Sequence, residues 1–248
     1  MNYWKNLPFL LWMIQSLRHI VGDGKYIDKA KTKGMTSSEQ KLIAVAENKW
    51  TDKLLKHFKI DVIVEGQENI PKGPILVVAN HQSYADIPVI IRAMNGKQIG
   101  FIARDNLGNI PLFGKWILRI RSLLLHRDDP RSAVKTFKDG EIMLREGFSL
   151  AVFPEGTRHQ DGVMGEFKKG SLRVARQAGV PILPVTIHNS YKAFEAQGYI
   201  KPTTIRVCIH PQMITAKKTK DEVSLIREQV EQEIHDTLEE YNQAYPDR

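Results

Sequence analysis

The sequence has almost no cysteine and no long hydrophobic run near its N-terminus. Cys208 is the single cysteine among 248 residues, which excludes an internal disulfide framework and any metal site built from several cysteines. The apolar stretch over residues 7–14 is far short of the roughly 20 residues that a membrane-spanning helix needs. We therefore expect a protein of a reducing compartment without a simple transmembrane segment.

The composition is that of a folded, basic protein. Hydrophobic residues make up 42% of the chain and charged residues 26%, and 248 residues suit one sizeable domain with a smaller appendage. Lysine and arginine outnumber aspartate and glutamate by 36 to 28, which gives a net charge of +8. This charge favours anionic partners, which include phospholipid surfaces, nucleic acid and acidic carrier proteins, but does not choose among them.

Residues 1–58 predict a helical appendage. A first helix is expected after Pro8, and the sequence G-D-G at residues 22–24 is expected to break it. A second, lysine-rich helix opens at T-S-S-E-Q, with Ser37 or Ser38 as its N-cap. Apolar, aromatic and basic side chains together suit a membrane interface, so we predict a membrane-docking segment at 1–58 and the main domain at 59–248. Packing of both helices on the main domain is the alternative.

An apolar run at residues 75–79 stops at the polar sequence N-H-Q-S-Y-A-D, residues 80–86. This pattern predicts a buried strand that carries reactive groups at its carboxyl end, the edge where open α/β sheets bind ligands. His81 can take a proton from a hydroxyl group if a carboxylate such as Asp86 orients its ring. Positions five apart are rotated by roughly 140° on a helix, so we predict His81 in the turn and Asp86 on the helix that follows. A turn that merely caps this helix is the alternative.

A second polar cluster, P-E-G-T-R at residues 154–158, follows the strand predicted over residues 149–153. Arg158 can hold a phosphate through two hydrogen bonds, Glu155 can accept from a hydroxyl, and Gly156 lets the backbone approach a ligand. If the two strands are parallel, this cluster lies at the same sheet edge as His81. The alternative is a capped turn with an internal Glu–Arg pair.

These two clusters, in this order and about seventy residues apart, resemble the 1-acyl-glycerol-3-phosphate acyltransferase family of glycerolipid acyltransferases. Residues 104–114 resemble the second block of that family, although the family more often has lysine where this chain has Arg104. The sequence F-K-K-G, expected to open a helix at residue 167, and the strand over residues 179–187 also resemble family segments. Arg127 matches a basic residue that the family often has after its corresponding strand.

The resemblance implies an α/β fold, with a mixed, mostly parallel sheet flanked by helices and an N-terminal amphipathic appendage. It implies His81 and Asp86 as catalytic residues. It also implies a set of substrate-binding residues: Arg104, Glu155, Gly156, Thr157, Arg158 and Lys168.

The implied reaction moves a fatty acyl group from acyl-CoA or acyl-carrier protein to the sn-2 hydroxyl of 1-acyl-glycerol-3-phosphate, giving phosphatidic acid. It needs no metal and no other cofactor, and no nucleic acid partner is expected. The implied location is the cytoplasmic face of the cell membrane, where the protein would be monotopic or peripheral.

Two alternatives stay open. One is an acyltransferase with another acceptor, such as glycerol-3-phosphate or a lyso-aminolipid, and the other is a non-catalytic basic protein that binds anionic membranes or nucleic acid. The sequence G-F-S-L-A at residues 147–151 is not a nucleophile elbow, because its fifth residue is alanine and the predicted order is helix, turn, strand. We therefore predict Ser149 to be an ordinary strand residue and the mechanism to lack an acyl-enzyme.

Overall fold

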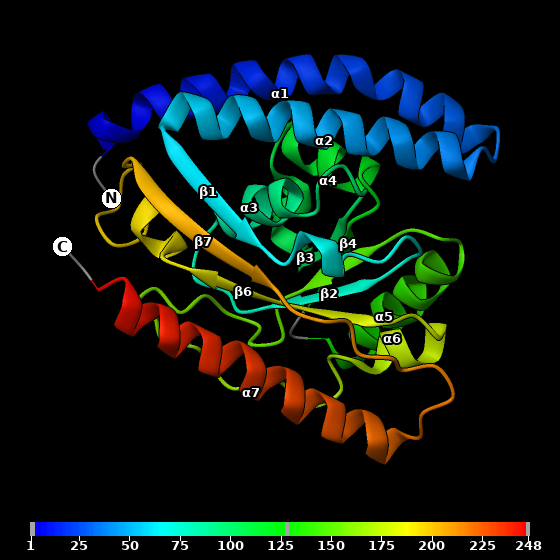
Figure 1. The fold of residues 1–248 in the computed structure, drawn as a ribbon. Helices are drawn as coiled ribbons and strands as arrows, with labels where there is room; N and C mark the ends of the chain where they lie inside the picture. The colour runs from blue at the N-terminus through cyan, green and yellow to red at the C-terminus, as the bar shows by residue number, and fades with distance from the viewer. Residues whose placement is uncertain (1–2, 127–128, 247–248) are drawn as a thin grey trace.

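A computed structural model, which describes residues 3–126 and 129–246, builds the chain around a seven-stranded sheet between two layers of helices (Figure 1). The strand order is β1-β7-β6-β2-β5-β3-β4, and each neighbouring pair is parallel except β6 and β7. The predicted mixed, mostly parallel sheet is confirmed. The strands are β1 (Ile60–Glu65), β2 (Leu76–Ala79), β3 (Gly100–Arg104), β4 (Leu123–Leu125), β5 (Leu150–Val152), β6 (Ile182–His188) and β7 (Thr203–Ile209).

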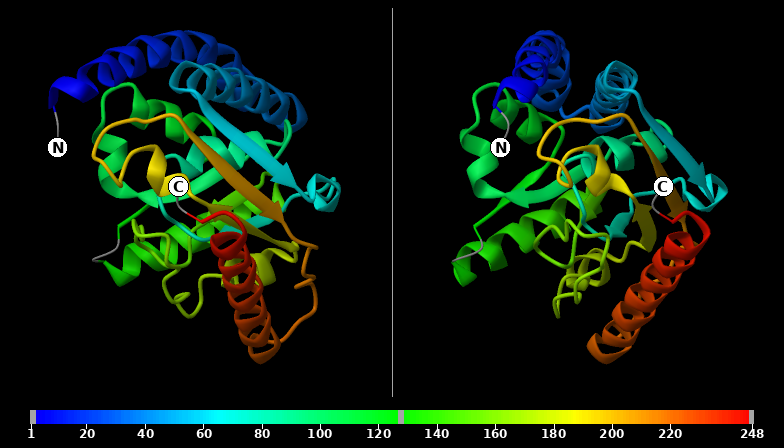
Figure 2. Two further views of the ribbon diagram at one scale, coloured as in Figure 1. Left: turned by 60° about the vertical axis from the view of Figure 1, so that its left-hand side comes forward. Right: turned by 90° about the vertical axis from the view of Figure 1, so that its left-hand side faces the viewer.

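Helices cover both faces of this sheet, as Figures 1 and 2 show. One layer contains α1 (Tyr3–Thr32), α2 (Thr36–Phe58), α3 (Asp86–Ala93) and α4 (Phe113–Arg119). The other contains α5 (Pro130–Arg145), α6 (Arg173–Ala178) and α7 (Lys220–Ala244). Short 3₁₀ turns follow β1, β3 and β6: η1 (Gln67–Asn69), η2 (Asp105–Asn109) and η3 (Ser190–Ala193).

The position of β2 in the middle of the sheet accounts for its apolar sequence. Each of its four residues is fully buried, with β5 on one side, β6 on the other and helices above and below. Parallel strands covered on both faces read as continuous hydrophobic runs, as this one does. Strands β2, β5, β3 and β4 are adjacent and parallel, so the loops that follow them leave the sheet at the same edge. This brings the sequence clusters after β2, β5 and β3 together.

The predicted break of the first helix at residues 22–24 was wrong, because α1 continues to Thr32. A glycine inside a helix costs about 1 kcal/mol relative to alanine. Packing outweighs this cost: Ile27 is buried, and Asp28 forms an ion pair with Arg119 of α4 at 2.7 Å. A side chain on Gly24 would collide with the Arg119 guanidinium, so the glycine lets the two helices approach closely.

Helix α2 begins without the predicted serine cap. Its N-cap is Met35, which makes no side-chain capping hydrogen bond, so the assignment of Ser37 or Ser38 was wrong. The first turn is fixed by a tertiary contact instead, since the buried Glu39 carboxylate pairs with Arg121 at 2.6 Å. The predicted boundary near residue 58 falls between α2 and β1, and buried residues of α1 and α2 belong to the same hydrophobic core as the sheet.

Candidate active site

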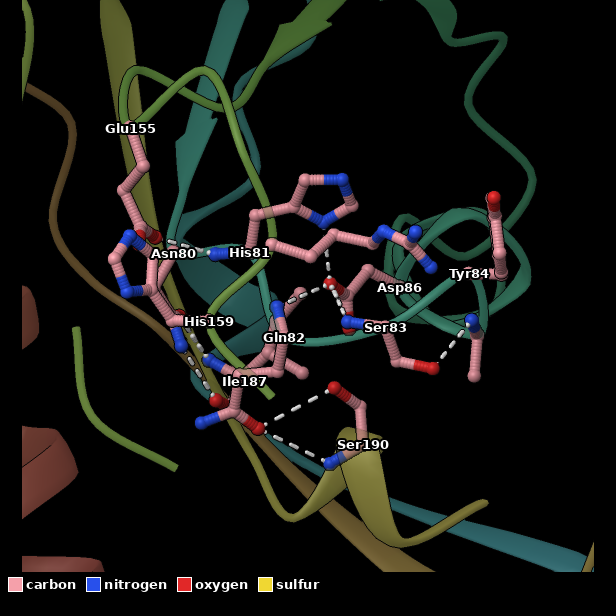
Figure 3. A network of polar contacts seen from close by, with 12 residues as sticks. Asn80, His81, Gln82, Ser83, Tyr84, Asp86, Glu155, His159, Ile187 and Ser190 are labelled. Atoms are coloured by element: carbon pink, nitrogen blue, oxygen red, sulfur yellow. Dashed lines mark hydrogen bonds and ion pairs between the residues drawn. The ribbon is translucent and has the colours of Figure 1, made fainter. Parts of the chain in front are cut away.

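The His81 and Asp86 side chains meet where β2 ends and α3 begins. His81 lies in the turn and Asp86 is the first residue of α3, as helix geometry predicted. The His81 Nδ1 atom is 2.7 Å from Asp86 Oδ2 (Figure 3). Because a carboxylate oxygen only accepts hydrogen bonds, Nδ1 carries a proton, and in the neutral ring Nε2 therefore keeps its lone pair. The pair is therefore arranged as a general base and its orienting carboxylate.

The Asp86 carboxylate is held rigidly. It is completely buried, and Oδ2 also accepts from the backbone N–H groups of Gln82 at 2.8 Å and Ser83 at 2.9 Å. Its second oxygen, Oδ1, has no hydrogen-bond partner among the described residues. Three donors thus converge on one oxygen, and charge-assisted bonds of this kind fix the ring that they orient.

The turn that carries His81 is tied to β6 and the loop beyond it. The Asn80 side chain donates to the carbonyl of Ile187 and accepts from its N–H, both at 2.8 Å. The Gln82 side-chain oxygen accepts from the N–H of Ser190 at 3.2 Å and from its hydroxyl at 3.3 Å (Figure 3). These bonds hold the base in place before any substrate arrives.

Phe153 connects the His81 ring to a pocket. The two rings are stacked with their centroids 3.9 Å apart, and no hydrogen bond joins His81 Nε2 to another described residue. Phe153 also lines a pocket of about 590 Å³ at the carboxyl ends of β3, β4 and β5. Most of the other lining side chains are apolar, such as Leu125 and Phe137, or basic, such as Arg173, and the lining also contains Ser171, Gln177 and the carboxylate of Glu141. Apolar walls with a few charged groups are typical of small-molecule sites.

Arg104 and Lys168 both line this pocket, as does Gly156. Arg104 is the last residue of β3, two strands from β2, which places its backbone about 10 Å from the end of that strand. Gly156 adopts φ +71°, and a side chain there would lie 2.6 Å from Lys168 Nζ. The glycine therefore allows both the turn and the position of the lysine.

The prediction that a helix opens at Phe167 was wrong, because α6 begins only at Arg173.

The Glu155 side chain holds the backbone of the His81 turn through a hydrogen bond. Its buried carboxylate accepts from the N–H of His81 at 2.6 Å and from the N–H of Gly165 at 2.8 Å, and it lies 3.4 Å from His159 Nε2. Burial raises the pKa of Glu155 from 4.5 to about 8, although the two backbone hydrogen bonds act in the opposite direction. Burial therefore favours the neutral form of the Glu155 side chain near Asp86. Contact of Glu155 with a substrate stays a prediction.

Arg158 forms an ion pair that the sequence did not reveal. Its Nη1 atom is 2.8 Å from Glu195 Oε1, and its guanidinium lies 3.7 Å from the centroid of the Tyr84 ring. Glu195 also accepts from the Ser83 hydroxyl at 2.6 Å and from the Tyr84 N–H at 3.0 Å. The arginine is thus held at the His81 turn, and its partner is Glu195, not the neighbouring Glu155. No local motif marks Glu195, which follows η3.

Thr157 and Arg127 are the remaining residues that the sequence predicted. Thr157 is exposed, and its hydroxyl makes no hydrogen bond to another described residue. Arg127 lies outside the described residues. In the described part of the chain, no group of three or more His, Cys, Asp or Glu side chains is placed to hold a metal ion.

Comparisons with known proteins agree with this geometry. The model of the Acyltransferase family matches residues 61–188. A 1-acyl-sn-glycerol-3-phosphate acyltransferase of Pseudomonas aeruginosa is 30% identical over 179 residues, which cover 71% of this chain and 68% of that one. The chloroplastic 1-acyl-sn-glycerol-3-phosphate acyltransferase LPAT1 of Arabidopsis thaliana is 37% identical over 158 residues, which cover 62% of this chain.

The match covers 43% of the Arabidopsis protein and 56% of a probable enzyme of the same name from Mycoplasma pneumoniae, so the chain spans about half the length of these relatives. Among solved structures, the 1-acyl-sn-glycerophosphate acyltransferase PlsC from Thermotoga maritima matches with a TM-score of 0.73 and 28% identity. That alignment covers 93% of this chain and 97% of the other.

Proposed function

The chain belongs to the acyltransferase family, and we propose that it transfers a fatty acyl group from a thioester to the sn-2 hydroxyl of 1-acyl-glycerol-3-phosphate. The observation that carries this proposal is the His81–Asp86 pair, whose imidazole stacks on Phe153, a residue that lines a pocket with apolar walls and basic residues. A basic protein that only binds anionic membranes or nucleic acid has no use for an oriented imidazole.

The chemistry follows from the protonation state of His81. Nε2 takes the proton of the acceptor hydroxyl as its oxygen attacks the thioester carbonyl carbon, and Asp86 stabilises the imidazolium that forms. The tetrahedral intermediate then collapses, the C–S bond breaks, and the leaving sulfur takes the proton back from Nε2. The products are an ester and a free thiol. The two substrates supply every atom of the products, and His81 takes one proton and returns it. We therefore propose a mechanism without a metal or other cofactor.

Binding of a phosphorylated acceptor is supported by the cations around the pocket. Arg104 and Lys168 line it, and Arg158 is held against Tyr84, in the turn after His81, by its ion pair with Glu195. The apolar side of the pocket suits the hydrocarbon chain of a lysophospholipid better than glycerol-3-phosphate, which has none. We therefore propose that Arg104, Lys168 and Arg158 hold the phosphate while the acyl chain lies against the apolar wall.

Membrane docking through α1 is the further part of this proposal. Four apolar side chains of α1, each between 45% and 59% exposed, recur at helical spacing: Leu7, Leu10, Leu11 and Ile14. Unpartnered apolar stripes of this kind mark interaction surfaces. Three lysines of α2, Lys49, Lys53 and Lys56, line a groove between α2 and α1. None of the described helices could cross a bilayer. We propose that α1 lies in the membrane surface at its cytoplasmic face.

One assay tests the reaction. Free thiol released from palmitoyl-CoA should depend on 1-acyl-glycerol-3-phosphate, and phosphatidic acid should form in equal amount. Glycerol-3-phosphate and lysophosphatidylethanolamine, supplied separately, decide whether another acceptor is preferred. Thiol release that is absent with each acceptor and with palmitoyl-carrier protein as donor refutes the proposed reaction.

Vesicle sedimentation tests the docking. The double substitution Leu11→Ser and Ile14→Ser should weaken binding to vesicles that contain anionic lipid. Leu225→Ser is the matched control, because Leu225 is 60% exposed on α7, on the other layer of helices. Equal binding by the wild type and the double variant would contradict the docking.

A further inference from the structure

A second pocket, of about 480 Å³, lies between α6 and α7. Its basic lining residues come from α6, from α7 and from the segment before α6: Lys169, Arg173, Arg176, Lys220 and Arg227. Leu172 and Val223 give it an apolar floor, and no carboxylate of the described residues lines it. We call this the α6/α7 groove. Cations gathered in a concave surface attract an anion that carries more than one charge.

Arg227 is the most buried of the basic residues that line the groove. The residue is 9% exposed, and its terminal nitrogens are engaged: Nη1 contacts Glu231 and the Phe167 carbonyl, and Nη2 contacts Glu228. Its Nε atom is buried and has no hydrogen-bond acceptor among the described residues. These contacts fix the Arg227 side chain at the wall of the α6/α7 groove.

The groove adjoins the pocket beside Phe153. Lys169, Gly170 and Arg173 line both of them. The Ser171 hydroxyl, which lines the pocket, is also buried without a hydrogen-bond partner among the described residues. One elongated ligand can therefore occupy the groove and extend toward the His81 ring. The proposed reaction requires such a ligand, because the thioester of the donor must reach His81.

We propose that the α6/α7 groove binds the phosphorylated nucleotide end of an acyl-CoA donor, an assignment that rests on the proposed acyl transfer. The nucleotide end of coenzyme A carries a diphosphate and a 3′-phosphate, which match a cluster of basic side chains, and a flat base, which suits the apolar floor. The groove volume lies in the range of small-molecule sites, about 300–1,000 Å³. A carrier protein would instead need an interface of about 800 Å² on each partner.

Charge reversal at Lys220 is the most direct test. Lys220 is the first residue of α7, where the N-cap Thr219 and Glu222 form a capping box. An acidic residue in the first turn favours the helix, so Lys220→Glu should fold normally. We expect the KM for palmitoyl-CoA to rise about tenfold or more, while the KM for 1-acyl-glycerol-3-phosphate stays unchanged. The KM for palmitoyl-pantetheine, which lacks the nucleotide, should also stay unchanged.

Lys72→Glu is the matched control. Lys72 is exposed in the turn before β2, at the opposite edge of the sheet, and the substitution makes the same change in net charge. It should leave all three KM values as in the wild type. Equal increases for palmitoyl-CoA and palmitoyl-pantetheine in Lys220→Glu, or no increase for either donor, would overturn the assignment.

Direct binding separates this inference from the proposed reaction. Adenosine 3′,5′-bisphosphate should bind the wild type in calorimetry and bind Lys220→Glu about tenfold more weakly or worse. Such binding in a protein that makes no phosphatidic acid would support the groove and refute the reaction. Phosphatidic acid synthesis without binding of the nucleotide, or synthesis from palmitoyl-carrier protein but not from palmitoyl-CoA, would refute the groove.

Discussion

Replacing Asp86 by asparagine should separate the charge of this residue from its geometry. Its Oδ2 atom accepts three hydrogen bonds and its Oδ1 atom accepts none from the described residues. An asparagine should therefore place its carbonyl oxygen at the Oδ2 position, because an NH₂ group there would face the N–H groups of Gln82 and Ser83. His81 keeps its Nδ1–H bond and its tautomer in this variant. The negative charge alone is lost.

The size of the effect follows from Coulomb's law. An imidazolium and a carboxylate about 4 Å apart attract each other by about 4 kcal/mol at an effective dielectric constant of about 20. Loss of this attraction in the transition state corresponds to a fall in kcat of about 10³-fold. The amide nitrogen of the variant occupies the site without partners, so the free energy of unfolding should fall by about 1–3 kcal/mol.

Steady-state kinetics and urea denaturation of Asp86→Asn measure both quantities. The KM for 1-acyl-glycerol-3-phosphate should change little, because Asp86 is buried and does not line the pocket. Asp236→Asn is the control, since His235 and Asp236 form an exposed pair on α7 at 3.4 Å. A fall in kcat of less than about tenfold would show that the carboxylate charge does not serve the reaction.

Three further predictions concern the residues around this pair. The pKa of Glu155 in the folded protein is about 8, which is above its ordinary value of 4.5. Between these two pH values the folded protein therefore binds one proton more than the unfolded chain. The stability that this proton gives is lost as the pH rises through 8. Urea denaturation should show that Glu155→Gln flattens this fall between pH 5 and 8, and an unchanged slope would contradict the assignment. Gly156→Ala should lower the free energy of unfolding by about 1–3 kcal/mol, because φ is +71° and Lys168 Nζ occupies the space, and no loss would refute this reasoning. Arg158→Lys, which keeps the charge and loses the planar fork, should raise the KM for 1-acyl-glycerol-3-phosphate about tenfold with kcat retained, whereas an unchanged KM would remove the arginine from the phosphate site.

The sequence predicted the centre of this fold well, because local patterns determine it. The apolar run of β2 predicted a buried strand, and its abrupt end at Asn80 marked the carboxyl edge. Helix geometry alone placed His81 in the turn and Asp86 on α3. These features depend on residues that are close in the chain.

The features that the sequence did not reveal depend on distant contacts. Glu195 contacts Ser83 across 112 positions, and the partners of Glu155 are backbone groups of His81 and Gly165, which carry no side-chain signal. Helix α1 crosses two glycines because its other side chains pack on α4, and local propensity does not include that packing. Local patterns thus place the reacting groups, whereas tertiary contacts decide which groups position them.

The substitution His81→Ala removes the side chain to which the general-base role is assigned. Thiol released from palmitoyl-CoA in the presence of 1-acyl-glycerol-3-phosphate should fall by about 10³-fold or more, since general-base catalysis and its orientation are both lost. The thermal unfolding midpoint should stay near that of the wild type, because Asn80, Gln82 and Glu155 still hold the turn through groups other than the ring. Near-normal thiol release by a folded His81→Ala protein would contradict the mechanism.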